Sequence, residues 1–267
     1  MNNNEFHRIT YPPVRLFTAD MGRISREKHA ILTLLEVDIT DALKKIRELR
    51  EPGKKVSLLA WFIKVLADTV ANHPPINGIK TGKTSVVVFE RVDVSTIVEK
   101  AVEGTPVPLP LVLRGANQKT HYQINDEIQA AVTQPVDDEG NYVLGKKENT
   151  LLMKLGVIAP RWLRLFIMRK FILGNPKRVQ EMMGTVMVSS LGTIGRITGW
   201  IIPTSMHPLS LGIGTLNKKP AVHAGKIEPR DILHLTIAFD HDVVDGMPAR
   251  KFVDELVTKL ESAAGLE

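Results

Sequence analysis

One histidine and one aspartate, four residues apart near the end of the sequence, have the types and spacing of a proton-transfer site. His241 follows the β-rich run Leu233 to Phe239, where a buried strand runs out into a loop. Its ring can therefore be held rigidly and still face a cavity. An imidazole takes a proton from a thiol or a hydroxyl near neutral pH and returns it, so His241 is a candidate general base.

The aspartate of this H-x-x-x-D-G pattern is better suited to support than to chemistry. Asp245 stands at a strand-to-helix junction, where a carboxylate can pair with an arginine and accept backbone N–H bonds. Gly246 permits a backbone conformation that is closed to other residues. The pattern is short, and its alternative interpretation is a surface loop ahead of a helix.

Several regular elements are expected to position this loop. Apolar residues at helical spacing predict a helix after Gly246, an amphipathic helix after Asp38-Ile39-Thr40 with Thr40 as its N-cap, and a strongly apolar core helix that Pro74 and Pro75 end. Residues 83–113 alternate well enough for two or three strands, and a short helix follows at 123–132.

The stretch AFDHDVVDGMPARKFVDEL resembles the C-terminal signature of a known family, the catalytic domain of dihydrolipoamide acyltransferases from 2-oxo acid dehydrogenase complexes. This family shares its fold with chloramphenicol acetyltransferase. The resemblance implies that His241 is the general base and that Asp245 is structural. Residues 184–222 are similar to the family's Ser-x-Leu-Gly turn and Leu-Gly-x-Gly strand, which implies that the Ser189 hydroxyl stabilises the oxyanion. The alternative for Ser189 is an ordinary turn residue.

The fold implied by this resemblance is a two-layer α/β sandwich of a mixed sheet and helices. The resemblance also implies a homotrimer that can assemble into a larger cage, with each active site between two chains, the histidine from one and the serine from its neighbour. We expect residues 1–24 to be an extended arm and residues 25–267 to be the catalytic domain. Because the superfamily pairs the aspartate with an N-terminal arginine, Arg15, Arg23 and Arg26 are candidates for Asp245; each is otherwise solvated.

Two segments depart from the family pattern. Residues 103–109 occupy the position where the family has Asp-Gly-Leu before Val-Pro-Val, in the region that lines its acyl channel. The sequence therefore does not identify the acyl group. An apolar and basic insertion occupies about residues 135–175. It is expected to be a core or subunit-interface helix; the alternatives are a wall of a pocket for a bulky acyl chain, or an interfacial membrane segment, which the lack of a clean polar face disfavours.

The amino-acid composition excludes several kinds of catalytic residue and binding partner. The 267 residues include no cysteine, which excludes a cysteine nucleophile, disulfides and thiolate metal ligands, and no metal site is expected. Acyl transfer would then be direct, between two bound substrates. The net charge of +6 suits the phosphates of coenzyme A, whereas an aromatic content of 5% and the absence of a nucleic-acid motif argue against nucleic acid. The first residues lack the features of a signal peptide, so a cytoplasmic location is expected.

We therefore expect an acyltransferase that acts between coenzyme A and dihydrolipoamide, or from an acyl-coenzyme A to another acceptor. Coenzyme A or lipoamide would be a substrate, no cofactor would be covalently bound, and no cofactor-binding residue can be assigned. A stand-alone catalytic domain without lipoyl or subunit-binding domains is expected, so that any lipoyl protein would act in trans. The alternatives are a non-catalytic trimeric scaffold and a small-molecule O-acetyltransferase.

Overall fold

A mixed six-stranded sheet forms the centre of the computed structural model, which describes residues 14–49, 56–102, 105–133, 159–190 and 198–267. The strand order is β1-β8-β7-β6-β4-β5. The β4/β6 and β6/β7 pairs are parallel and the other pairs are antiparallel. The bounds are β1 Ala30–Asp38, β4 Val94–Val102, β5 Thr105–Leu113, β6 Val186–Ser190, β7 Leu209–His223 and β8 Lys226–Asp240.

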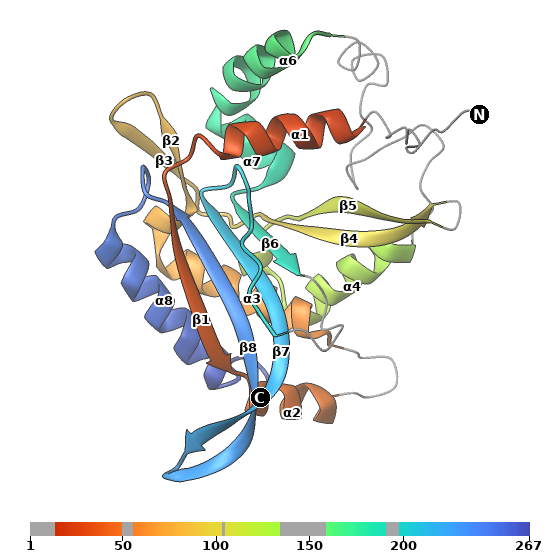
Figure 1. Cartoon of the computed structure of the whole chain (residues 1–267), viewed down its shortest axis with the longest axis vertical. Coiled ribbons are helices and arrows are strands. Elements are labelled where there is room, and N and C mark those ends of the chain that lie inside the picture. The colour runs from red at the N-terminus through yellow and green to blue at the C-terminus, as the bar shows by residue number, and fades with distance from the viewer. Residues whose placement is uncertain (1–13, 50–55, 103–104, 134–158, 191–197) are drawn as a thin grey trace, which may run out of the picture.

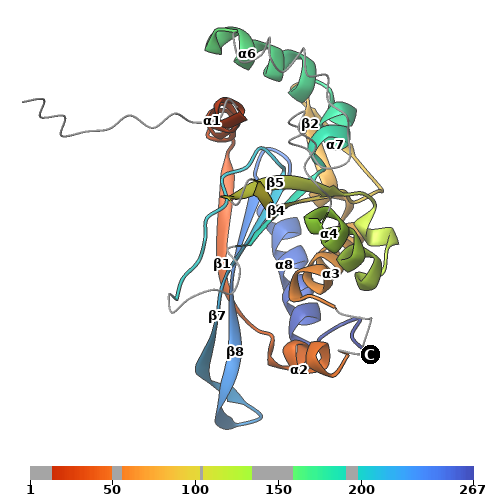
Figure 2. The same ribbon diagram turned by 90° about the vertical axis from the view of Figure 1, so that its right-hand side faces the viewer.

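Helices cover one face of this sheet (Figures 1 and 2). They are α2 Thr40–Glu48, α3 Leu58–Asn72, α4 His121–Thr133 and α8 Gly246–Glu261. The core lies between the two layers, where Trp61 and Phe62 of α3 and Phe252 of α8 are fully buried against Leu235 and Ile237 of β8. The predicted two-layer α/β sandwich is confirmed.

Smaller elements join these layers. A second sheet consists of β2 Gly78–Thr81 and β3 Ser85–Val88. The 3₁₀ helices η1 Pro74–Asn77 and η2 Ala116–Gln118 follow α3 and β5. Pro74 and Pro75 end α3 as predicted, because proline cannot continue the helical hydrogen-bond ladder. The region 83–113 contains three strands, at the upper end of the prediction.

The face of the sheet opposite the helices carries a strap, defined as residues 198–206. A Cβ atom at Gly212 of β7 would lie 2.5 Å from the carbonyl oxygen of Ile201, so only glycine allows the strap to lie this close. Trp200 packs edge-on against His234 of β8, with ring centroids 4.5 Å apart. The strap explains why both faces of β8 are buried from Arg230 to Asp240.

Two local predictions are wrong. Residues 14–24 are not an extended arm, because α1 is a helix at Val14–Ser25; residues 1–13 lie outside the described residues. Thr40 is not the N-cap of α2, because Ile39 occupies that position. Instead, the Asp38 carboxylate accepts hydrogen bonds from the Thr40 backbone N–H (3.0 Å) and hydroxyl (2.6 Å). The threonine oxygen in turn accepts from the N–H of Asp231 (2.7 Å).

The described part of the insertion forms α6 Arg161–Ile167 and a π-helical turn at Met168–Leu173 (η3), and α7 Pro176–Met183 follows it. The expectation of a core helix is wrong for residues 161–173: no side chain of this described stretch is buried, and Trp162, Phe166 and Phe171 are 69%, 55% and 53% exposed. A subunit-interface role stays a prediction. Within the described residues, no helix combines the length and the apolar character needed to cross a membrane.

Ion pairs hold this segment on α1, at the edge of the molecule (Figure 1). The Nε atom of Arg164 lies 2.7 Å from Asp20, whose side chain is completely buried. Arg169 pairs with the exposed Glu27, just after α1. Polar anchors of this kind place the segment beside α1 and away from the sheet, which explains why its apolar side chains stay uncovered within the chain.

The C-terminal half of β7 and the N-terminal half of β8 extend past their neighbours as a projecting hairpin, residues 216–231 (Figure 2). Its turn has Ala224 and Gly225 at φ values of 49° and 78°, the left-handed pair typical of a type I′ turn. Pro220 of one strand stands opposite Pro229 of the other.

Candidate active site

His241 is fixed where β8 ends beside the start of β1. Its backbone N–H donates to the carbonyl oxygen of His29 at 2.8 Å, directly beyond the last ladder pair, Ala30 with Asp240. The Asp240 carbonyl accepts from the N–H groups of Val243 and Val244, at 2.9 and 3.1 Å, which closes the loop into a tight turn. The His241 side chain is half-buried directly after β8, which agrees with the predicted strand exit. That its ring faces a cavity stays a prediction.

A second histidine, which the sequence analysis missed, stacks on this ring. The centroids of His29 and His241 are 5.2 Å apart and the two planes are inclined by 23°. His29 gives no motif of its own. It could have been found only from the antiparallel pairing of β1 with β8, which places the residue before one strand beside the residue after the other.

Ion pairs surround the two imidazoles. Lys28 Nζ lies 2.7 Å from the Asp240 carboxylate, and Lys80 Nζ of β2 lies 2.9 Å from that of Asp242. The hydrogen bond and charge of Lys80 lower the pKa of Asp242, and positive charge on His29 or His241 lowers it further. The Asp242 carboxylate is therefore close enough to both rings to respond to their protonation.

Asp245 occupies the N-cap position of α8, but its side chain makes no capping hydrogen bond. The expected ion pair with Arg23 or Arg26 is absent from the described part of the chain. Arg23 instead pairs with Asp20 at 3.4 Å, because both residues lie on α1. Gly246 also differs from the prediction: among the described residues nothing lies within 4 Å of an added Cβ, and its φ is not left-handed. Another residue would fit there.

Ser189 and His241 do not meet within one chain. Ser189 of β6 pairs with Gly212 of β7, and Gly212 pairs with Thr236 of β8. Thr236 lies five residues before His241. Two strand spacings of about 4.8 Å and five rises of about 3.3 Å put the two Cα atoms roughly 19 Å apart. The Ser189 side chain points away from the core face that Val186 and Val188 occupy, and it is partly exposed.

A cavity of about 210 Å³ lies between the strap, the start of β1 and the end of β8. Asp240, which precedes His241 in sequence, lines it. Lys28, Arg26, Asp240, Ser205 and His207 are among its lining residues. The His207 Nε2–H donates to the Met183 carbonyl (2.7 Å), which leaves Nδ1 to accept the Ser205 hydroxyl at 2.6 Å. Burial, partly offset by this backbone hydrogen bond, lowers the pKa of His207 to about 4. The ring is thus neutral at pH 7 and holds the end of α7 on the sheet.

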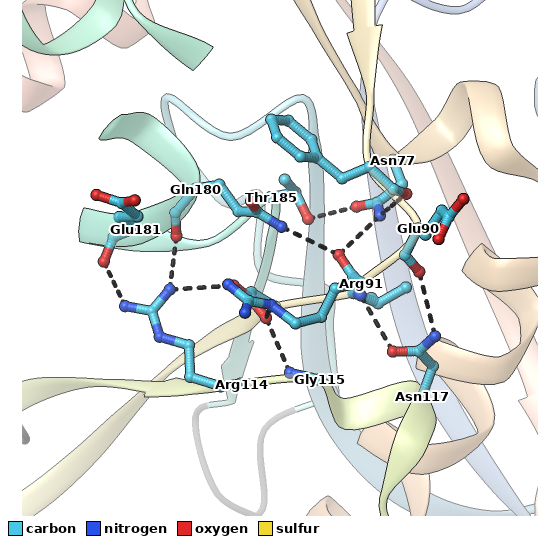
Figure 3. Close-up of polar contacts among 12 residues, drawn as sticks. Asn77, Glu90, Arg91, Arg114, Gly115, Asn117, Gln180, Glu181 and Thr185 are labelled. Carbon is cyan, nitrogen blue, oxygen red and sulfur yellow. Dashed lines mark hydrogen bonds and ion pairs between the residues drawn. The ribbon is translucent and has the colours of Figure 1, made fainter. Parts of the chain in front are cut away.

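A polar network fixes the remaining elements around the site (Figure 3). At its centre is the fully buried Asp93 carboxylate, which accepts from Arg91 Nε and Nη2 (both 2.9 Å), Arg114 Nη1 (3.1 Å) and the Gly115 N–H (2.8 Å). Arg114 also donates to the carbonyl oxygens of Gln180 and Glu181 at the end of α7.

Asn77 extends this network to the small sheet. Its side-chain amide donates to the carbonyl oxygens of Phe89 (2.7 Å) and Arg91 (3.1 Å), which bracket the return from β3 to β4. The network therefore joins β4, β5 and α7 to the hairpin that carries Lys80. In the part of the chain that the structure describes, no three His, Asp or Glu side chains are grouped to hold a metal ion.

Comparisons with known proteins agree with this architecture. The family model for the 2-oxoacid dehydrogenases acyltransferase (catalytic domain) matches residues 4–139 and 174–266. The unmatched residues 140–173 lie within the insertion predicted at about 135–175. The acetyltransferase component of the pyruvate dehydrogenase complex from Staphylococcus epidermidis is 25% identical over 228 residues, 83% of this chain and 43% of the relative. The chain thus spans less than half the length of such relatives.

Solved structures share the fold. A probable dihydrolipoamide acetyltransferase from Listeria monocytogenes has a TM-score of 0.67 at 20% identity, over 97% of this chain and 95% of that one. The Azotobacter vinelandii dihydrolipoamide acetyltransferase gives 0.65 at 18%, over 100% and 97%. A chloramphenicol acetyltransferase gives 0.50 at 10%, over 95% of both chains. Since the family model covers most of its residues, this chain belongs to the 2-oxoacid dehydrogenase acyltransferase family, as a catalytic domain.

Proposed function

We propose that this domain transfers an acyl group between the thiols of coenzyme A and dihydrolipoamide, with His241 as general base. The observation that carries the proposal is the placement of His241, held by backbone hydrogen bonds at the end of β8 in a chain of this family. The work on the Azotobacter vinelandii enzyme concerns the catalytic roles of a serine, a histidine 52 positions later and an asparagine four positions beyond it. Ser189, His241 and Asp245 have the same spacing, with aspartate in place of asparagine.

The proposed reaction proceeds through one tetrahedral intermediate. His241 takes the proton of the attacking thiol, and the sulfur forms a bond to the carbonyl carbon of the acyl thioester. Ser189 donates a hydrogen bond to the oxyanion, an interaction worth about 3 kcal/mol in comparable sites. The intermediate collapses, the second carbon–sulfur bond breaks, and the leaving thiolate recovers the proton from the imidazolium. Asp245 acts through the geometry of the loop.

The separation of Ser189 from His241 supports a site shared between two chains of a homotrimer. The sheet face that carries the strap also supports association, because large apolar side chains are exposed there. Leu32 and Leu34 of β1 point to this face, since they pair with Ala238 and Thr236 of β8, and Ile202 of the strap is exposed beside them. Burial of such a patch favours oligomerisation. Assembly of trimers into a larger cage and an acyl donor carried on a separate lipoyl protein belong to the same proposal.

The test is transfer from a panel of acyl-coenzyme A donors of increasing chain length to free dihydrolipoamide, followed by mass spectrometry. His241→Ala should reduce turnover by about 10² to 10⁴, the share of a positioned general base. His223→Ala is the matched control, because His223 is an exposed histidine beside the hairpin turn. Activity of His241→Ala equal to that of the wild type would overturn the assignment. A correctly assembled protein without transfer activity would favour a scaffold.

A further inference from the structure

We propose that His29 is a positioning residue for the general base: its ring supports one face of the His241 imidazole. The inference rests on the proposed function of His241. It adds a second imidazole, from the other end of the chain, to the site.

Two independent contacts join the residues. The backbone bond from His241 N–H to the His29 carbonyl (2.8 Å) fixes the two Cα atoms, and the nearly parallel rings stack at 5.2 Å. Two rings in this arrangement restrict each other's rotation about the Cα–Cβ bond. A general base has to hold its nitrogen within hydrogen-bond reach of the thiol, so restricting the rotation of His241 contributes directly to rate.

Ion pairs hold the backbone on both sides of the two rings. Lys28, next to His29 in sequence, pairs with Asp240, next to His241, and Lys80 of β2 pairs with Asp242. These contacts join the residues before β1 to the end of β8 and so help to keep the two rings stacked.

Two variants test the support by the ring. His29→Phe keeps an aromatic face and should keep a kcat close to that of the wild type. His29→Ala loses this face and should lose roughly tenfold in kcat, with KM unchanged. Because the side chain of His29 is exposed, thermal unfolding should be close to that of the wild type for both variants.

The controls keep this inference separate from the proposed function. His223→Ala should leave kcat unchanged. If His241→Ala abolishes transfer while His29→Ala keeps the wild-type kcat, or while His29→Phe loses as much kcat as His29→Ala, the role of the His29 ring is refuted and the general base stands. If His241→Ala is fully active, the proposed function itself fails, and the His29 inference fails with it.

Discussion

Mixing two inactive chains gives the sharpest test of how the active site is composed. Ser189→Ala removes the oxyanion donor and His241→Ala removes the base, so each variant alone should be impaired at every site. If each site takes its histidine from one chain and its serine from the next, a mixed trimer regains sites in which both residues are intact. A site built within one chain cannot be regained in this way.

The structure sets the expected magnitude. Ser189 and His241 of one chain are roughly 19 Å apart, whereas both groups must lie within about 3 Å of the reacting atoms. With random mixing of equal amounts, half of the sites receive an intact histidine and half of those an intact serine. Activity per trimer should therefore return to about one quarter of the wild-type value in the random mixture, and to about one third once homotrimers are removed, because each mixed trimer then has one intact site of three. The Ser189→Ala homotrimer should show about one hundredth, and the His241→Ala homotrimer less.

The assay uses two affinity tags, one on each variant, co-expression, and sequential purification that retains only mixed trimers. Wild-type chains mixed with chains carrying both substitutions provide the matched control. In the random mixture, a shared site predicts about one quarter of full activity for this control, and a site within one chain predicts about one half. Mixed trimers no more active than their parents, together with one half in the control, would refute the shared site.

Three further predictions concern stability. In the unfolded chain His207 is protonated below about pH 6.5, whereas in the folded chain it stays neutral down to its pKa of about 4. As the pH falls through this window, His207 should lower the free energy of unfolding by about 3 kcal/mol, and its own contribution should not change further below pH 4. In urea titrations His207→Gln should lack that share of the decline, and a pH dependence identical to that of the wild type would contradict the burial effect. Asp20→Ala leaves Arg164 without its buried carboxylate and should weaken the docking of residues 161–173 on α1 by about 3 kcal/mol. Limited proteolysis would detect this change as faster cleavage within residues 161–173. Glu27→Gln breaks only an exposed ion pair and should change the cleavage rate little. Ala224→Asn replaces a residue held at a φ of 49° with one that tolerates this region, so Tm should rise by one or two degrees in calorimetry, and a fall would count against strain in the turn.

Local sequence signals predicted much of the fold. The apolar repeat of α3 and its two terminating prolines fixed one helix to within a few residues, and the alternation before His241 located the strand that carries it. His241 also lies where the pattern placed it, because a strand-to-loop boundary depends on neighbouring residues only. The limits of the insertion could be predicted because its composition interrupts the order of helices and strands that the family has.

Features that depend on distant contacts could not be predicted in the same way. The helix α1 is held by the contact of Asp20 with Arg164, 144 positions away, whereas the prolines just before it suggested an extended arm. The stacking of His29 on His241 follows from the β1–β8 register, which no local pattern encodes. The arginine expected beside Asp245 was carried over from the family, and in this chain Arg23 has a nearer carboxylate in Asp20.

The projecting hairpin bears on how the protein avoids aggregation. Beyond the ends of β1 and β6, both edges of residues 216–230 present backbone groups that a strand of another molecule can pair with. Val222 and Ile227, 76% and 77% exposed, would make such pairing more favourable. Pro220 and Pro229, opposite each other, remove one N–H donor from each edge, and the exposed Lys226 beside the turn adds repulsion between copies. The two prolines therefore let a hairpin with two exposed apolar side chains extend into water without becoming a template for edge-to-edge association.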